Sequence, residues 1–349
     1  MLHTRLRPLP RAALHPHCST SSASGATPDY HSEDDHSDED PEDLFASFIQ
    51  IPHLFPDDVP SFHGDPGQHL LYSSLRYGDI RIMVPSYPEQ TKEKPPEEAS
   101  GVLPANDEAT DVEEGRRLFA HFVWSAGMVV SEGIELAESK HPAAEEYREV
   151  WSVRGEKVLE LGAGAGLPSV TAALAGASAI TITDHPSSPA LGPTGALSFN
   201  TKFNIPSTTP CTIDIRPHEW GTTLEPDSWA VASKGTYSRI IAADCYWMAS
   251  QHENLARTMK WFLAPEGRVW CVAGFHTGRE IVAGFFETVE RVGLVIERIF
   301  ERDLNTSFEG AYGEREVRRK WMSEREDEGP ENLRRWCVVA VLRHAPGSD

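Results

Sequence analysis

KVLELGAGAGLPS, at residues 157–169, carries the strongest fold signal in this sequence. It opens with an apolar run around Val158 and Leu159, continues with three glycines at alternate positions, and ends in residues that favour a helix. This order is typical of a buried parallel strand, a tight glycine turn and a helix. Glycine has no Cβ, so the backbone of the turn can approach a ligand closely.

The ligand expected at this turn is S-adenosylmethionine. Helix N-terminal amides suit an anion, but Glu160 at the tip of the strand opposes a pyrophosphate and favours a cationic or hydroxyl-bearing ligand. S-adenosylmethionine carries an amino group, ribose hydroxyls and a sulfonium. The spacing G-x-G-x-G also departs from the G-x-G-x-x-G of dehydrogenases. We therefore place Glu160, Gly162 and Gly164 in the cofactor site.

Composition limits the class of protein. The chain has 349 residues, 40% of them hydrophobic, and a formal net charge of −21. A nucleic-acid partner is not expected, because phosphate binding needs clustered Lys and Arg, and an acidic protein more readily meets a basic partner. Five cysteines without a C-x-x-C pair indicate a reduced, intracellular chain. No apolar run reaches the length of a membrane span.

The chain is expected to divide into three parts. Residues 1–42 are expected to be a disordered acidic tail, which contains all but the last residue of the stretch EDDHSDEDPED at 33–43. Residues 43–110 are expected to form an N-terminal clasp with a hairpin at 70–84 and a flexible loop at 86–110. Residues 111–345 form the main domain. The arginines near the N-terminus only weakly favour a mitochondrial transit peptide, so we expect a cytoplasmic protein, with a nuclear one as the alternative.

Strands and helices alternate through the main domain. Helices are expected at 115–137 and 141–151, before the glycine strand. Alternating β and α segments predict a Rossmann-like α/β fold, with a doubly wound, seven-stranded, mostly parallel sheet. Strands are expected at 157–161, 178–183, 211–216, 238–243, 268–274, 294–300 and 334–343. A charged insertion at 301–333 precedes the last strand, which we expect to be an antiparallel edge strand. Ligands of such sheets bind at the carboxyl ends of the strands.

Two tryptophans and an aspartate are candidates for cofactor contacts. Asp184 ends the second strand and can bind ribose hydroxyls; a tight turn with a helix cap is its alternative role. Trp220, in HEWG after the third strand, can stack on adenine. Trp124, in HFVWSAG before the glycine strand, can cover the cofactor from the other side. Packing in the core is the alternative for both tryptophans.

The segment Asp244–Cys245–Tyr246–Trp247 follows the fourth strand and borders both cofactor and substrate in this architecture. A carboxylate with two aromatic rings can hold an amine through charge attraction and a cation–π face. The alternative is an N-cap aspartate with aromatics that pack locally. His276, in AGFHTGR, is expected to be a bystander at the edge of the site rather than a base.

Asn200 and Asn204 lie in the helix after the second strand. We expect both to be caps or solvent contacts rather than ligands.

Five features occur in one order along the chain: Trp124, ELGAGAGLPS, TITD, HEWG and D-x-x-W. Together they resemble the family of seven-β-strand (class I) protein lysine methyltransferases, which modify translation factors and chaperones. The resemblance covers about residues 110–345. Within the family the chain is similar to fungal members labelled nicotinamide N-methyltransferase-like and to fungal elongation-factor N-terminal and lysine methyltransferases.

The resemblance implies roles for individual residues. It implies that the cofactor is held by Trp124, Gly162, Ala163, Gly164, Asp184, Trp220 and the backbone of Ala243. It implies that Asp244 to Trp247 matches the D-x-x-aromatic motif that faces the substrate, which makes Asp244 and Trp247 the candidate catalytic pair. Trp247 stands where Tyr or Phe is commoner, and the insertion at 301–333 is atypical, so the target stays open.

We therefore expect an N-methyltransferase that uses S-adenosylmethionine and acts on a protein amine, either a lysine side chain or an α-amino group. A basic translation factor fits the acidic chain as a target. A small amine such as nicotinamide is the alternative acceptor. A third hypothesis is a non-catalytic scaffold whose acidic tail and insertion bind a basic partner. No metal site is expected, and the protein is expected to be a monomer.

Overall fold

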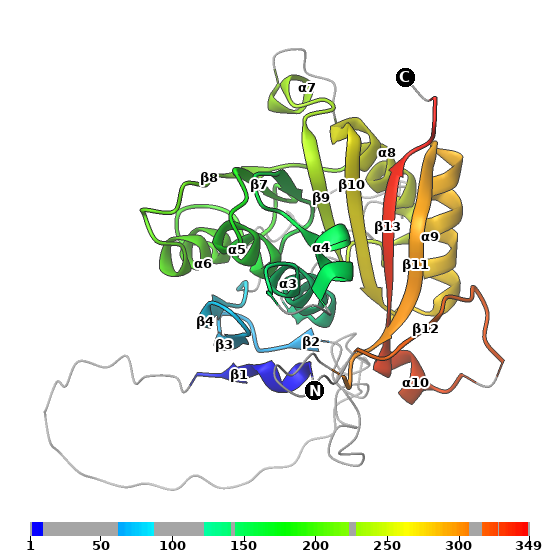
Figure 1. The fold of residues 1–349 in the computed structure, drawn as a ribbon, viewed down its shortest axis with the longest axis horizontal. Coiled ribbons are helices and arrows are strands. Elements are labelled where there is room, and N and C mark those ends of the chain that lie inside the picture. The colour runs from blue at the N-terminus through cyan, green and yellow to red at the C-terminus, as the bar shows by residue number, and fades with distance from the viewer. Residues whose placement is uncertain are drawn as a thin grey trace, which may run out of the picture. The chain divides into compact units, whose positions relative to one another are not determined.

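A twisted, mostly parallel sheet lies at the centre of the fold (Figure 1). The computed structural model describes residues 2–9, 62–86, 122–140, 144–222, 228–306, 316–326 and 328–347, all within the unit formed by residues 1–9 and 59–349. The strands of the large sheet are β6 (Lys157–Glu160), β7 (Ala179–Asp184), β8 (Thr212–Pro217), β9 (Tyr237–Ala243), β10 (Leu263–Gly274), β11 (Leu294–Asp303), β12 (Arg318–Lys320) and β13 (Trp336–His344).

Helices connect these strands. They are α3 (Ser125–Ala137), α4 (Glu145–Trp151), α5 (Leu167–Leu174), α6 (Ala196–Asn204), α7 (Trp229–Ala232), α8 (His252–Phe262), α9 (Arg279–Arg291) and α10 (Pro330–Arg335), with a 3-10 turn η4 (Ala249–Gln251). The predicted alternation of strand and helix through the main domain is confirmed. Of the helix expected at 115–137, residues 115–121 lie outside the described residues, and the described helix begins at Ser125 because Val123 and Trp124 are extended in a short strand, β5 (Val123–Trp124).

The strand order is β12-β11-β13-β10-β9-β6-β7-β8. Pairing from β8 through β7, β6 and β9 to β10 is parallel, which confirms the predicted doubly wound sheet. The last strand, β13, is antiparallel as expected, but it lies between β10 and β11 instead of at the edge. The edge strand is β12, an additional antiparallel strand of three residues. It lies in the insertion at 301–333, where the sequence indicates charge but predicts no strand.

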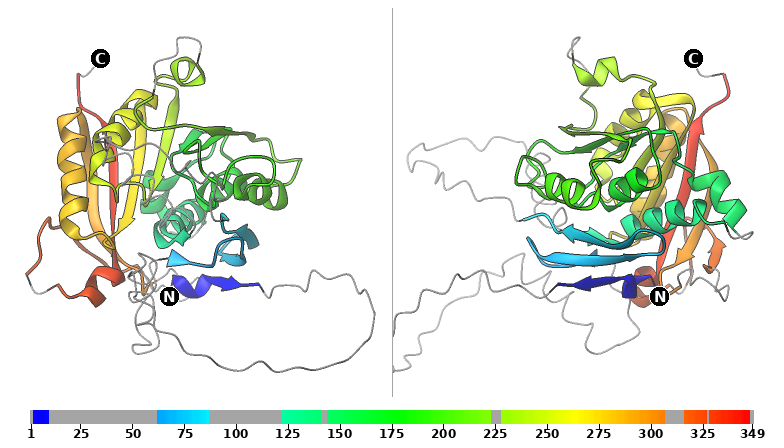
Figure 2. Two further views of the ribbon diagram at one scale, coloured as in Figure 1. Left: turned by 180° about the vertical axis from the view of Figure 1, so that it is seen from behind. Right: turned by 60° about the vertical axis from the view of Figure 1, so that its left-hand side comes forward.

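Each face of the sheet has its own core, because neighbouring residues of a strand point to opposite faces. On β10, Trp270 and Val272 belong to the core under α3, α4 and α5, whereas Val269 and Cys271 belong to the core under α8 and α9. Both faces are therefore covered, as Figure 2 shows from two further directions. Strand order reverses at β6, which lies between β7 and β9. The carboxyl end of β6 is thus the topological switch point, where ligands of such sheets bind.

The N-terminal part adds a small sheet and a strand pair. The hairpin predicted at 70–84 is confirmed as β3 (His69–Ser74) and β4 (Gly78–Met83). A short strand, β2 (Phe62–His63), pairs with β5, so that Phe62 lies opposite Trp124. The proposed domain boundary at residue 110 and nearly all of the loop at 86–110 lie outside the described residues.

Two asparagines dock the hairpin on α6. Asn200 accepts a hydrogen bond from the amide of Met83 at 2.7 Å and donates to its carbonyl at 3.0 Å. Asn204 makes the same pair of bonds with the backbone of Arg81. The expectation that both are caps or solvent contacts is wrong. Each side-chain amide takes the place of a neighbouring strand along the edge of β4.

The first residues are ordered, which corrects the prediction of a tail from residue 1. They form a 3-10 turn, η1 (His3–Arg5), and a strand, β1 (Leu6–Pro8), that pairs with β3. The Arg5 side chain is 8% exposed and forms ion pairs with Glu132 at 3.1 Å and Glu135 at 2.6 Å, both on α3. Composition missed this contact because the burial of one arginine depends on carboxylates 127 and 130 residues away. Residues 10–42 lie outside the described residues.

We predict that Arg5→Ala lowers the free energy of unfolding by about 3 kcal/mol, because it removes the cation paired with the buried Glu135 and one of the two arginines paired with Glu132. Urea unfolding measures this change. Arg7→Ala is the matched control in the same segment, since Arg7 and its partner Asp79 are both exposed. An exposed pair contributes at most about 1 kcal/mol. Equal effects of the two substitutions would mean that the Arg5 contacts do not hold the N-terminus.

Candidate functional site

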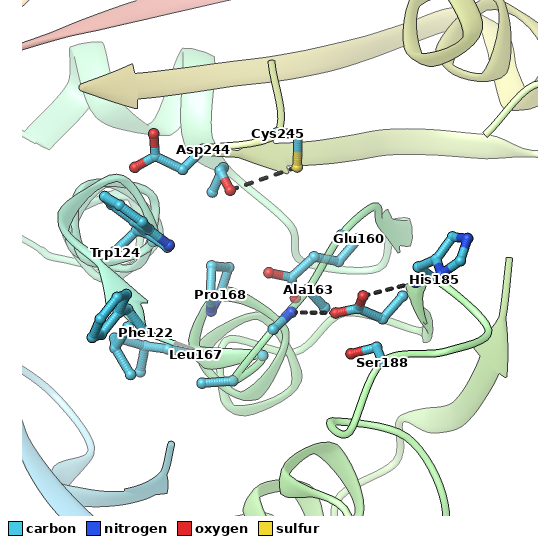
Figure 3. A pocket seen from close by; sticks show the side chains of 18 of the residues that line it. Phe122, Trp124, Glu160, Ala163, Leu167, Pro168, His185, Ser188, Asp244 and Cys245 are labelled. Carbon is cyan, nitrogen blue, oxygen red and sulfur yellow. Dashed lines mark hydrogen bonds between the residues drawn. The ribbon is translucent and has the colours of Figure 1, made fainter. Parts of the chain in front are cut away.

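A cavity opens at the carboxyl ends of β6, β7 and β9, at the switch point of the sheet. The residues that the sequence marked as site residues all line it: Trp124, Glu160, Gly162, Ala163, Gly164, Asp184, Trp220, Ala243, Asp244 and Trp247. Figure 3 shows Trp124 and Asp244 on one side, His185 and Ser188 on the other, and Glu160 and Ala163 between them. The structure thus brings together residues spread over more than a hundred positions of the chain.

The glycine turn forms the floor of this cavity. Gly162 and Gly164 have positive φ angles, 59° and 51°, which favour glycine. A Cβ on Gly162 would lie 3.0 Å from the Cys245 sulfur and 3.2 Å from the Trp220 ring, so the packing of these side chains leaves no room for a larger residue here. A Cβ on Gly164 would meet no heavy atom of the described residues within 4 Å. Gly164 therefore turns its open side to the cavity, where a ligand can approach the backbone.

Asp184 braces the turn. One carboxylate oxygen accepts the amide of Gly164 at 2.7 Å, and the other accepts the amide of His185 at 2.7 Å. The residue is 9% exposed. A carboxylate oxygen offers about two lone-pair sites, so each oxygen can accept a second bond from a hydroxyl group in the cavity. The expected ribose contact is thus compatible with the structural role of Asp184.

Glu160 joins the strand to the helix across the turn. Its Oε2 accepts the backbone amide of Ser169, in the first turn of α5, at 3.1 Å, and also the Ser169 hydroxyl. Burial raises the pKa of Glu160 to about 8, against the opposing effect of these hydrogen bonds. A cation in the cavity would favour the ionised form, because opposite charges attract strongly at low dielectric.

Trp124 is held between aromatic groups. Its ring stacks on His276, with centroids 4.4 Å apart and planes inclined by 24°. Phe62, on the paired strand β2, contacts it edge-on at 5.7 Å. Trp220 packs partly against the core below α8. Each ring therefore combines a packing role with a face on the cavity, so the two roles considered for them do not exclude each other.

Asp244 has a positive φ of 56°, which is rare for a residue other than glycine. Its amide donates to Val272 at 2.7 Å, which ties the strained residue to β10. Strain of this kind collects at functional sites. Burial raises the pKa of the Asp244 carboxyl group to about 8, against a hydrogen bond from the Gly274 backbone.

Trp247 lines the cavity with Asp244, but Tyr246 does not. Tyr246 is 1% exposed and stacks on Phe285, with centroids 4.3 Å apart. The expectation of two aromatic rings beside the carboxylate is therefore wrong for Tyr246. Cys245 lines the cavity next to Asp244, so Tyr246 is the one residue of the 244–247 segment that does not line it, and its side chain is directed into the core.

Sequence reasoning missed several lining residues, among them Phe122, His185 and Ser188. The aromatic Phe122 beside Trp124 was a usable signal. The His185 and Ser188 side chains reach the cavity only because the chain turns after β7, which no local pattern announces. Among the described residues, no group of three or more His, Cys, Asp or Glu side chains is arranged to hold a metal ion. No described helix has the length and apolarity of a membrane span.

The cavity fits the groups of S-adenosylmethionine. An open glycine backbone, a carboxylate for hydroxyl groups, a second acid for a cation and a tryptophan face lie around one space. Asp244 and Trp247 line the same cavity and can meet an amine there. This arrangement suits a transfer between two bound partners, because groups for each partner lie around one space.

Comparison with known proteins agrees with this geometry. A family model described as lysine methyltransferase matches residues 106–292, more than half of the chain. The matched region contains every candidate site residue.

The chain is also similar to fungal proteins named protein N-terminal and lysine N-methyltransferase EFM7. The protein from Candida glabrata is 28% identical over 54% of this chain and 72% of its own length. The one from Yarrowia lipolytica is 29% identical over 58% and 74%. The one from Schizosaccharomyces pombe is 25% identical over 68% and 82%.

We predict that Gly164→Arg abolishes cofactor binding, because its side chain would occupy the open space in the cavity. Isothermal titration calorimetry with S-adenosylmethionine measures this. Gly155→Arg is the matched control: Gly155 also has a positive φ, 75°, and open space, but it precedes β6 at the opposite end of the strand. Both variants bear a backbone penalty of about 1–2 kcal/mol. Normal binding by Gly164→Arg would contradict the assignment.

We predict that Asp184→Ala weakens cofactor binding about ten- to a hundredfold, since a charge-assisted hydrogen bond contributes roughly 1.5–3 kcal/mol. Calorimetry and a melting curve on the same preparation separate this loss from unfolding. Asp184→Asn retains one acceptor for the turn and serves as the comparison. Unchanged affinity in a destabilised Asp184→Ala protein would leave Asp184 with the bracing role alone.

Proposed function

The chain belongs to the lysine methyltransferase family, and on this premise we propose that it transfers a methyl group from S-adenosylmethionine to an amine of a protein. The observation that carries the proposal is one cavity shared by the glycine turn and by Asp244 and Trp247. A cofactor on the turn and an amine beside Asp244 would meet inside it.

S-adenosylmethionine, when bound, would supply the methyl group of its sulfonium: the lone pair of a neutral amine would attack the methyl carbon in line, the carbon–sulfur bond would break, and S-adenosylhomocysteine would leave. The turn at Gly164, with Asp184, Glu160 and Trp124, would hold the cofactor in place. Asp244 and Trp247 would align the amine. Alignment is the main contribution that such a site makes, because a well-oriented pair has already lost the freedom that the reaction would otherwise remove.

The acceptor amine must be neutral to react, and free lysine has a pKa of about 10.4. The buried surroundings lower the pKa of an amine that enters the cavity. A fully ionised carboxylate beside it would raise that pKa again. Because burial raises the pKa of Asp244 to about 8, this carboxyl group stabilises an ammonium less than an ordinary aspartate does. Asp244 can then orient the amine without fixing it in the charged form.

A protein acceptor is favoured over nicotinamide by the names of the similar fungal proteins. The net charge of −21 favours a basic target, such as a basic translation factor, in the cytoplasm. Tritiated S-adenosylmethionine, incubated with the protein and with a lysate from cells that lack it, tests the proposal. A labelled protein band supports it. Label in nicotinamide alone, or binding without transfer, would point to the small-amine enzyme or to the scaffold.

We predict that Asp244→Ala and Trp247→Ala keep near-normal cofactor affinity but lower methyl transfer by at least about tenfold, roughly 1.4 kcal/mol of barrier. Cofactor contact at this position is expected from the Ala243 main chain, which neither substitution changes. Affinity, melting temperature and label incorporation are measured on the same preparations.

Asp214→Ala and Trp261→Ala are the controls for this prediction, because both residues lie outside the cavity wall. Their activity per folded molecule should match the wild type. Full turnover by Asp244→Ala would return this segment to a packing role.

A further inference from the structure

His276 lies beside the two walls of the cavity without forming part of its lining. It follows β10, between Phe275 and the start of α9. Its side chain is 13% exposed, and burial lowers its pKa to about 4, so the imidazole is neutral at physiological pH. A buried neutral imidazole offers one N–H donor and one nitrogen acceptor. The role of His276 therefore depends on which groups contact its ring nitrogens and its ring face.

One side of the ring meets Asp244. The Nδ1 atom lies 3.6 Å from Asp244 Oδ1, an oxygen that is buried and makes no hydrogen bond within the described part of the chain. This distance is longer than a hydrogen bond, but contacts of this kind commonly tighten when the reacting complex forms. A buried carboxylate oxygen without a donor is unfavourable. His276 Nδ1 is therefore placed to satisfy it.

The face of the ring meets Trp124, as the stacked centroids 4.4 Å apart show. Trp124 is assigned to the cofactor and Asp244 to the amine, and both line the cavity on the same side in Figure 3. The neighbouring Phe275 stacks on Trp321, a residue of the insertion, with ring centroids 6.0 Å apart. One imidazole thus lies against a residue assigned to the cofactor and a residue assigned to the amine.

We propose that His276 is a positioning residue for methyl transfer, which orients the Asp244 carboxyl group through Nδ1 and holds Trp124 through its ring. This inference rests on the proposed function. The proposed role differs from simple packing because the two contacts of His276 affect different steps, methyl transfer and cofactor binding. Loss of the Nδ1 contact should affect transfer, and loss of the stack should affect cofactor binding.

Two substitutions separate the contacts. His276→Phe keeps a ring for Trp124 and removes Nδ1. We expect cofactor affinity within about threefold of wild type and kcat lowered by at least about tenfold. His276→Asn carries an amide near the position of Nδ1 and removes the ring. We expect kcat within about threefold of wild type and cofactor affinity weakened about three- to tenfold, the size of a lost aromatic contact.

A double-mutant cycle with Asp244→Ala decides whether His276 acts through Asp244. If it does, His276→Phe lowers kcat little further once the carboxyl group is gone. Independent losses that multiply would overturn the proposal. His344→Phe is the control: this histidine donates a hydrogen bond from Nε2 to the Leu263 carbonyl, at the opposite end of β10, and its replacement should leave turnover unchanged.

Label incorporation at saturating cofactor gives kcat, calorimetry gives affinity, and melting curves report folding. If His276→Phe does not fold, His276→Asn decides alone: a tenfold loss of kcat at normal cofactor affinity would overturn the assignment. The proposed function fails separately, if the wild-type protein neither binds S-adenosylmethionine nor transfers its methyl group. A wild-type enzyme that is active, with His276→Phe equally active, refutes only the role of His276.

Discussion

Three carboxyl groups are buried around one glycine turn, and their need for hydrogen-bond donors or protons determines the structure of the whole site. Glu160, Asp184 and Asp244 follow or end three adjacent parallel strands, and each is at most 9% exposed. A buried carboxyl group must find hydrogen-bond donors or keep its proton. Asp184 takes two backbone amides, whereas Glu160 and Asp244 combine backbone donors with a pKa raised to about 8. The cavity is therefore acidic in composition without holding three full negative charges.

This arrangement explains why backbone conformation at the site is unusual. The amide of Gly164 reaches Asp184 only because the turn has positive φ, and the side chain of Asp244 reaches the cavity from a residue that also has positive φ. The sheet supplies the rigidity that such conformations need, through β6 and through the bond from Asp244 to Val272 on β10. A regular strand in its place would direct the Asp244 side chain differently.

Elements outside the central sheet complete the cavity. Trp124 is held by the β2–β5 pair on one side and by His276 on the other. Asn200 connects the hairpin to the turn directly, because its amide group donates to the carbonyl of Ala165 as well as to Met83. The N-terminal segment is fastened below α3 through Arg5. The N-terminal part thus supports the walls of the site and is not an appendage to it.

The sequence by itself determined the order of strands and helices, the hairpin at 70–84, the location of the glycine turn and the acids at the strand ends. These features depend on local periodicity and on residue types whose backbone preferences are strong. Only the tertiary structure decided the rest: that β13 enters between β10 and β11, that Arg5 is buried, that Asn200 and Asn204 act as a strand edge, and that His276 rather than Tyr246 adjoins Asp244. In each case the partner that decides the contact is distant in the chain. Polar side chains reveal such roles only when folding removes water from them and requires a specific partner.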